Sequence, residues 1–174
     1  MEDPLRLVQG NDQTLVAPIE GFESFVEGNH ERLFGALCLL TKDRYEAEEI
    51  AQEAFVRILE RWDRVRAVDD PTAYLFRTAM NVFRKRYRRA LLSLRRAAAI
   101  APRDDFVERI EAQDLVVRAI AQLSRDQRAA LIVTSLLGYS SDEAAQILGV
   151  RSSTVRARAT RARTALRVAI GEER

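Results

Sequence analysis

The sequence has 174 residues, with 28 basic and 26 acidic side chains and a formal net charge of +2, which is enough chain for one domain or two small ones. It has one cysteine, Cys38, one histidine, His30, and no apolar run long enough to span a membrane. These counts exclude an intramolecular disulfide and leave almost nothing for a zinc site or a histidine-dependent triad. Phosphate-loop and nucleophile motifs are also missing, so we expect neither an enzyme nor a need for a cofactor or metal. The acidic first residues do not resemble a secretion signal, and we expect a cytoplasmic protein without membrane insertion.

The small net charge hides a segregation of charge along the chain. Seven basic residues and no acid lie between Arg84 and Arg96, and six arginines and no acid lie between Arg151 and Arg167. Between Asp43 and Glu60 there are six acids against two arginines. Two basic blocks indicate two contacts with a polyanion, whereas the acidic block indicates a partner other than nucleic acid. The alternative is that each block is a solvated face.

The N-terminal half is predicted to be helical after an unassigned tail at residues 1–20. Apolar residues at helical spacing predict a first helix over 22–40 and a second over 43–62. Asp70 is a plausible N-cap and Pro71 suits a first turn, so a third helix is expected to begin there.

The sequence predicts an all-α fold of two small helical domains joined by a flexible linker. The linker is placed at residues 93–105, which separate a domain at 21–92 from a domain at 106–170. In the second domain, a helix is predicted over 123–137.

A helix-turn-helix pattern follows. A short helix is predicted over 141–148, with Ser140 or Ser141 as its cap, and Gly149 provides a tight turn because glycine tolerates a positive φ. Ser152 is the expected cap of a last helix that reaches about Ala169. A short helix, a glycine turn and a basic helix together are typical of proteins that place the second helix in the major groove of DNA.

The last helix separates an apolar face from a polar one. Its core-facing residues are Val155, Ala159, Ala162 and Leu166. Its opposite face carries the residues predicted to contact duplex DNA, namely Ser153, Arg156, Ala157, Thr160 and Arg161. Arginine can bond a guanine edge in bidentate fashion, and Thr or Ala can meet a thymine methyl.

The third helix has a similar division. Leu75, Ala79, Val82 and Phe83 share one side. The other side carries a second set of predicted DNA contacts, namely Tyr74, Arg77, Asn81, Arg84, Lys85 and Arg88. An aromatic ring can stack on an unpaired base and an Asn can read a base edge, so this face suits DNA that is partly single-stranded.

The second helix carries an acidic stripe that would repel DNA and would suit a basic protein surface. The stripe consists of Glu46, Glu49, Glu53 and Glu60, with Gln52 near it.

These motifs resemble the sigma-70 family, and in particular its two-domain extracytoplasmic-function (ECF) group. The family's region 2 is similar to the stretches Ala47–Phe55 and Tyr74–Asn81, and its region 4 is similar to the pattern from Leu123 to Leu166. The helix-turn-helix half alone would also resemble LuxR-type regulators, and the region 2 match separates the two. The sequence departs from the family pattern at three positions. It has Tyr74 where the family usually has Trp, Lys85 where it usually has Asp, and Ala144 where it usually has Ile.

The resemblance implies a promoter-specificity subunit of bacterial RNA polymerase and a role for each surface. Glu49, Gln52 and Glu53 would bind the β′ clamp helices. The third helix would recognise and melt the −10 element, the last helix would bind the −35 element, and the 123–137 segment would rest on the β flap. An anti-sigma factor is a further candidate partner, and the free protein is expected to be a monomer. The alternative is a stand-alone helix-turn-helix regulator that binds duplex DNA as a dimer.

Three single residues are interpreted as structural. His30 is expected at the edge of the first helix's apolar face, Cys38 as a small core residue, and Trp62 as a core residue that ends an apolar stripe.

Overall fold

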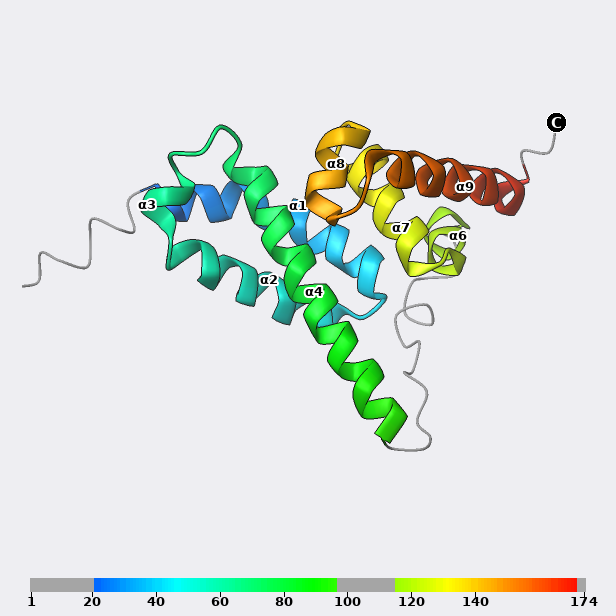
Figure 1. The fold of residues 1–174 in the computed structure, drawn as a ribbon, viewed down its shortest axis with the longest axis horizontal. Helices are drawn as coiled ribbons and strands as arrows, with labels where there is room; N and C mark the ends of the chain where they lie inside the picture. Colours follow the sequence, from blue (N-terminus) through cyan, green and yellow to red (C-terminus); the bar gives the residue numbers. More distant parts are fainter. Residues whose placement is uncertain (1–20, 97–114, 172–174) are drawn as a thin grey trace, which may run out of the picture.

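The computed structural model describes residues 21–96 and 115–171 of the chain. Within these ranges every regular element is a helix (Figure 1), which confirms the all-α prediction. In chain order the elements are α1 (Phe22–Thr41), α2 (Arg44–Leu59), α3 (Trp62–Val65), α4 (Pro71–Arg96), α6 (Leu115–Gln122), α7 (Arg125–Leu131), the π-helical turn η1 (Ile132–Leu136), α8 (Ser141–Leu148) and α9 (Ser152–Ile170).

Helices α1 to α4 form an N-terminal bundle in which α4 crosses the α1–α2 pair (Figure 1). The prediction that the second helix runs to Trp62 is wrong, because α2 ends at Leu59 and Trp62 begins α3. The break turns the indole toward the start of α1, where its ring centroid lies 5.3 Å from that of Phe22 and 5.1 Å from that of Phe25. Trp62 is therefore buried, as expected, but from a separate helix.

Aspartate side chains cap the N-termini of helices α2 and α4. The Asp43 carboxylate accepts hydrogen bonds from the Tyr45 and Glu46 amides at 2.8 and 3.0 Å, and Asp70 accepts one from the Ala73 amide at 2.8 Å. The Asp70 cap confirms the predicted start of α4. The helix then continues to Arg96, so residues 93–96 of the predicted linker are helical. The rest of that linker and residues 1–20 lie outside the described residues.

Helices α6 to α9 form a C-terminal bundle whose first part differs from the prediction. The helix expected over 123–137 is found as α7 followed by η1, but the prediction missed the separate helix α6, which ends just before Ser124 caps α7. Ser124 and Gln127 form a capping box, in which each side chain accepts from the other's backbone amide. Helix α7 then widens into η1, where the Leu137 amide donates to the Ile132 carbonyl at 2.9 Å.

Helices α8 and α9 form the predicted helix-turn-helix. Ser140 caps α8 through a capping box with Glu143, and Gly149 ends it with a φ of 60°. The prediction that Ser152 caps α9 is wrong, because Arg151 occupies the N-cap position without a side-chain bond. Ser152 is already inside the helix, where its hydroxyl accepts from the Arg156 guanidinium at 2.8 Å. Of the predicted core face of α9, Val155, Ala159 and Ala162 are buried and Leu166 is half-buried.

The two bundles are in contact. Buried side chains of α1 and α4 pack against α7, η1 and α8, so one apolar core runs through both bundles. Side chains from the two sides that line this contact are Leu33, Leu37, Phe76 and Met80 of the N-terminal bundle and Ala129, Ile132, Val133 and Leu137 of the C-terminal bundle.

Candidate nucleic-acid interface

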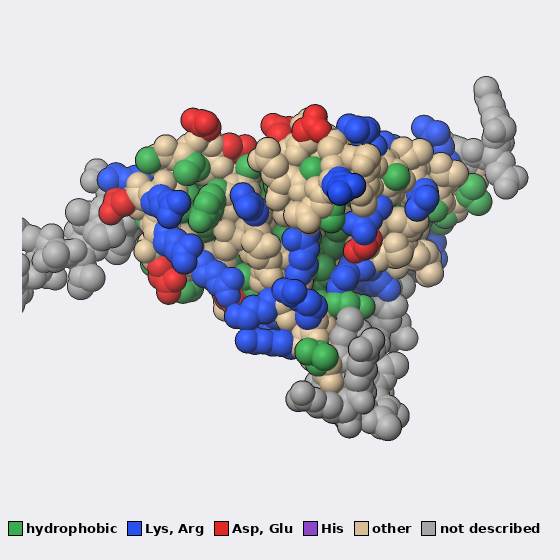
Figure 2. Space-filling model, viewed as in Figure 1, with side chains coloured by type: hydrophobic (Ala, Val, Ile, Leu, Met, Phe, Trp, Pro, Cys, Tyr) green, Lys and Arg blue, Asp and Glu red, His purple; other side chains and the backbone are tan. Residues whose placement is uncertain are grey.

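The polar face of α4 lies opposite its core face, as the sequence predicted. Leu75, Ala79, Val82 and Phe83 are all buried. Of the predicted DNA contacts, Arg77, Asn81, Lys85 and Arg88 are exposed, while Tyr74 and Arg84 are half-buried. Lys and Arg side chains gather on the side of the molecule that α4 crosses, with few acids among them (Figure 2). This surface can bind phosphates without strong repulsion from its surroundings.

The structure divides the six predicted contacts on α4 into two groups. Tyr74 and Arg77 border a groove whose other wall is α8, with Glu143 and Gln146. Asn81, Arg84, Lys85 and Arg88 line a separate surface hollow, which they share with Arg57 of α2 and Arg125 of α7. Arg57 and Arg125 were missed by sequence reasoning, because only the packing of three helices brings them to α4.

Arg84 is the least accessible cation of the α4 face. Burial, and next the nearby Arg125, lower the pKa of Arg84 from its ordinary value, and Asp126 partly offsets this effect. Asp126 is itself paired with Arg158 at 2.6 Å. Arg84 therefore stands where the two bundles meet rather than on an open surface.

The polar face of α9 is fully open. Ser153, Arg156, Ala157, Thr160 and Arg161 are all exposed, as predicted. The face combines two guanidinium groups, two hydroxyls and a methyl group within the N-terminal ten residues of α9, the second helix of the helix-turn-helix. This is a set of groups suited to reading base edges in a major groove.

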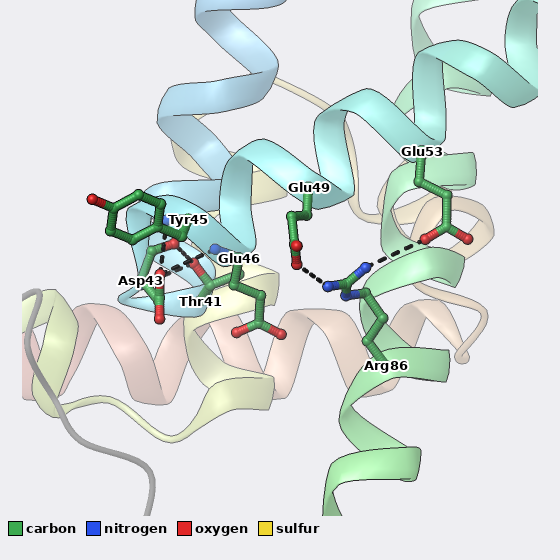
Figure 3. A network of polar contacts seen from close by, with 7 residues as sticks. All are labelled: Thr41, Asp43, Tyr45, Glu46, Glu49, Glu53 and Arg86. Carbon is green, nitrogen blue, oxygen red and sulfur yellow. Dashed lines mark hydrogen bonds and ion pairs between the residues drawn. The ribbon is translucent and has the colours of Figure 1, made fainter.

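Two carboxylates of the acidic stripe on α2 are paired with arginines of the same chain, and Figure 3 shows one of these arginines, Arg86, between Glu49 and Glu53. Arg86 of α4 reaches between two carboxylates, donating to Glu49 and lying 3.6 Å from Glu53. Glu53 also accepts from Arg57 at 2.5 Å. Arg86 lies within the predicted basic block, but its side chain faces α2 and not the side of α4 that carries the predicted DNA contacts.

The members of the stripe differ in their surroundings. Glu49, Gln52 and Glu60 are exposed, and the Gln52 amide donates to Glu48 at 3.1 Å. Glu46 is half-buried, and burial followed by the nearby Asp43 raises the pKa of its carboxyl group. Glu49, Gln52 and Glu60 are therefore open to solvent, whereas Glu53 is half-buried and paired with Arg57 and Arg86.

The single residues have structural surroundings. His30 is half-buried and stacks on Phe34, with ring centroids 5.9 Å apart. Cys38 is half-buried, and burial raises the pKa of its thiol, which disfavours the reactive thiolate. Among the described residues, no group of three or more His, Cys, Asp or Glu side chains could hold a metal ion. In the same ranges, no helix has the length and apolar character needed to cross a bilayer.

The sequence matches two family models whose order follows that of the two bundles. Residues 25–91 match sigma-70 region 2, and residues 113–166 match sigma-70 region 4. Together the matches cover more than two thirds of the chain. The chain belongs to the sigma-70 family, in its ECF group. Sigma factors of this family are DNA-binding initiation factors rather than enzymes, in agreement with the sequence-based expectation.

Named relatives support the ECF group. The ECF RNA polymerase sigma factor SigM of Mycobacterium tuberculosis is 27% identical over 173 residues, covering 94% of this chain and 86% of the relative. The ECF sigma factor SigC of the same species is 29% identical over 167 residues, covering 93% and 86%.

Solved structures share the fold of this sigma factor. The sigma factor RpoE in complex with the anti-sigma factor NepR, from Bartonella quintana, superposes with a TM-score of 0.73 at 24% identity. The superposition covers 89% of this chain and 99% of that one. CnrH in complex with the cytosolic domain of CnrY gives a TM-score of 0.60 at 24% identity, covering 89% and 90%.

Proposed function

We propose a division of labour among three surfaces of this sigma factor, whose function is to bind core RNA polymerase, recognise promoter elements and promote melting. The observation that carries the proposal is the placement of an exposed basic face on the region 2 helix α4 and an exposed reading face on the region 4 helix α9. The acidic stripe on α2 is the third surface. We place the protein in the cytoplasm, where the polymerase acts.

The α4 face is assigned to the −10 element. Lys85 and Arg88 would hold phosphates, Asn81 would contact a base edge, and the Tyr74 ring would support an unpaired base of the separated strand. Arg77 and Arg84 would add cationic contacts on either side of Asn81. The energy of holding unpaired bases would favour strand separation, and the polymerase would carry out the chemistry.

The α9 face is assigned to the −35 element, which is read as duplex. Arg156 and Arg161 would contact guanine edges or phosphates in the major groove, and Ser153, Ala157 and Thr160 would fit the bases between them. Their full exposure supports this assignment.

The middle of the α2 stripe is assigned to the polymerase. Glu49, Gln52 and Glu53 would contact the β′ clamp helices, and the α7–η1 segment of region 4 would rest on the β flap. An anti-sigma factor is a further proposed partner, since the solved relatives RpoE and CnrH are complexes with NepR and CnrY.

The decisive experiment is co-purification of the full chain with bacterial core polymerase. We expect wild-type protein to bind and the Glu49→Lys/Glu53→Lys variant to lose binding, because the substitutions place positive charge against a basic partner. A matched control is Glu23→Lys/Glu27→Lys, which makes the same charge change at two exposed positions of α1.

The outcomes separate the proposal from its alternative. Binding that survives the α2 variant, or that is lost equally in the α1 control, would contradict the assignment of the stripe. The absence of any binding to core, together with tight dimeric binding of a palindromic duplex, would favour a stand-alone helix-turn-helix regulator.

A further inference from the structure

A surface hollow beside α4 is lined by cations and one amide from three helices, and we call it the cationic hollow. Its lining residues are Arg57 of α2, Asn81, Arg84, Lys85 and Arg88 of α4, and Arg125 of α7. Every one of these side chains presents N–H donors, and none is acidic. Such a lining matches a ligand that is negatively charged and rich in acceptor oxygens.

The lining surrounds a space as well as following a line. Residues 81, 84, 85 and 88 are three or four positions apart, so they share one face of α4 over a length of about 10 Å at about 1.5 Å per residue. Arg57 and Arg125 stand outside this row, on the neighbouring helices. Charges that approach from three helices suit a compact ligand that carries several negative charges of its own.

The protein leaves most of this positive charge without a counter-charge. Among the described residues, Arg84, Lys85 and Arg88 form no ion pair with a carboxylate. Arg84 is half-buried, and burial followed by the nearby Arg125 lowers its pKa from the ordinary value. An anion bound in the hollow would favour the charged form of Arg84 and would reduce the repulsion between these cations.

Arg125 is held in an orientation that leaves donors unused. Its guanidinium carbon lies 3.6 Å from the centre of the Tyr87 ring, and stacking on a ring leaves the N–H edges of the guanidinium plane available. Asp126 lies 3.9 Å from this guanidinium but is engaged more closely by Arg158, at 2.6 Å. Within the part of the chain that the structure describes, Arg125 Nη1 has no hydrogen-bond partner. A guanidinium with a fixed plane and unused donors is well suited to an oxyanion.

The number of cations favours linked phosphates over simpler anions. A carboxylate or a single phosphate would engage only one or two of the lining side chains. Phosphates joined through shared oxygens place several charges and many acceptor oxygens within a short length. A DNA strand can follow the row on α4, but its phosphates are separated by sugars and it brings fewer charges into the space between Arg57 and Arg125.

We propose that the cationic hollow is a binding site for a chain of linked phosphates, either an inorganic polyphosphate or the phosphates of a nucleotide. Most of its lining also belongs to the surface assigned to the −10 element, so the ligand and the −10 strand would compete. Only this competition rests on the function proposed above. Binding of the phosphates themselves needs neither DNA nor polymerase.

Isothermal titration of the full chain with tripolyphosphate tests the site. In magnesium-free buffer at low salt, we expect one ligand per chain with a dissociation constant of about 10 μM or lower. Inorganic monophosphate should bind at least about 100-fold more weakly, because it forms fewer charge-assisted hydrogen bonds. Similar affinities for the two anions, or several equivalent sites per chain, would overturn the proposal.

Two variants test whether the ligand lies in the hollow. Lys85→Met removes a charge from an exposed side chain, and Arg125→Met removes the charge contributed by α7. We expect each to weaken tripolyphosphate binding about tenfold. The matched control is Arg118→Met, which makes the same charge change on an exposed part of α6 and should bind like wild type. Equal losses in all three would show diffuse attraction and overturn the proposal, and Lys85→Met decides the question if Arg125→Met does not fold.

Two further titrations identify the source of the phosphates and the link to DNA. Tighter binding of ATP or GTP than of tripolyphosphate would support a nucleotide, and weaker or equal binding would support an inorganic chain. Tripolyphosphate should also displace a labelled single-stranded oligonucleotide that carries the −10 sequence. Binding of tripolyphosphate at the hollow without displacement would support the phosphate site and contradict the −10 assignment of α4, so the two proposals fail separately.

Discussion

Helices α4 and α9 both carry many arginines, but the surroundings of these arginines differ between the two helices. On α9 the proposed reading face is fully exposed, and the structural work of the helix is done by small buried residues such as Val155 and Ala159. On α4, Arg86 holds the acidic stripe of α2, and Arg84 lies half-buried where the two regions meet. Within the described residues, Arg156 and Arg161 of the α9 reading face form no hydrogen bond or ion pair with another helix, although Arg158 on another side of α9 pairs with Asp126. Arg84 and Arg86 of α4, in contrast, both take part in the packing.

This difference implies that substitutions on the two helices will have different consequences. A change on the α9 face should alter DNA binding alone. A change on α4 should alter both DNA binding and stability. Loss of an arginine that is paired with a carboxylate should lower the stability, and loss of one that lies beside other arginines should raise it.

The largest effect, a loss of affinity for duplex DNA, is expected for the double substitution Arg156→Ala/Arg161→Ala on α9. Loss of two groups that each contribute about 1–3 kcal/mol to base discrimination should weaken binding of a −35 duplex about 100-fold or more. The duplex can be selected from random sequence by the wild-type holoenzyme and the affinity measured by gel shift. The melting temperature should stay unchanged, and a drop of several degrees would show that this face is structural after all.

Arg84→Met is expected to weaken DNA binding by a smaller factor and, at the same time, to make the folded protein more stable. Removing one cation should weaken binding of fork-junction promoter DNA by the holoenzyme about tenfold. Relief of the crowding with Arg125 should raise the free energy of unfolding by about 0.5 kcal/mol, measured by urea denaturation. Arg88→Met is the matched control on the exposed face of the same helix. It should weaken DNA binding without stabilising the protein, and equal stability changes in the two variants would refute the crowding of Arg84.

Ser140→Ala tests the framework that presents the α9 face. Loss of the α8 cap should destabilise the protein by about 1 kcal/mol in a denaturation experiment. Ser141→Ala, one residue further on and inside the helix, should have a smaller effect. The reverse order would mean that Ser141 is the cap in solution.

Arg86→Gln should lower the free energy of unfolding by about 0.5 kcal/mol, since it removes two ion pairs with carboxylates that are at least a third exposed. Arg66→Gln is the matched control, because its pair with Asp63 lies on a more exposed surface. Thermal melts at low and high salt would distinguish the Arg86→Gln variant from the Arg66→Gln variant. Equal, negligible changes would show that Arg86 does not hold the stripe.

The smallest expected effect is on the way the melting temperature changes with pH. Hydrogen bonds from Ser140 lower the pKa of Glu143 below its ordinary value of 4.5. The contribution of this carboxylate to stability is therefore complete above pH 4.5 and is lost as the pH falls through the lowered pKa. Glu143→Gln keeps an acceptor that does not titrate, so its melting temperature should fall less steeply with acid. Parallel curves for the two proteins would contradict this role of the carboxylate.

Features that depend on neighbouring residues in the chain were predictable from the sequence. Asp70 before Pro71 and the turn at Gly149 each act within one helical turn, and both are found as expected. Of the two serines predicted as alternative caps of α8, the structure uses Ser140. The exposed face of α9 follows from helical periodicity alone. The break before α7 was also readable, because Ser124 and Gln127 have the same spacing as Ser140 and Glu143.

Features that depend on tertiary packing were not predictable. Arg86 and Glu49 are 37 residues apart, and nothing in the basic block distinguishes Arg86 from its neighbours. Arg125 lies beyond the predicted linker, yet it completes the cationic hollow beside Asn81. Charge and periodicity identify which faces are polar, but only the packed helices decide which cations are already paired.

The π-helical turn η1 has a consequence for insertions and deletions. Ile132 and Leu137 are five residues apart and both face region 2, a spacing that a regular α-helix would not place on one side. Deleting one residue within η1, such as Ser135, would let the segment relax to an ordinary α-helix, in which Ile132 and Leu137 would be four residues apart and still share one face. The helix-turn-helix would therefore keep its direction relative to region 2. The same deletion in the regular part of α7 would instead rotate everything beyond it by about 100°, so a lost codon should be tolerated in η1 and not in the helix before it.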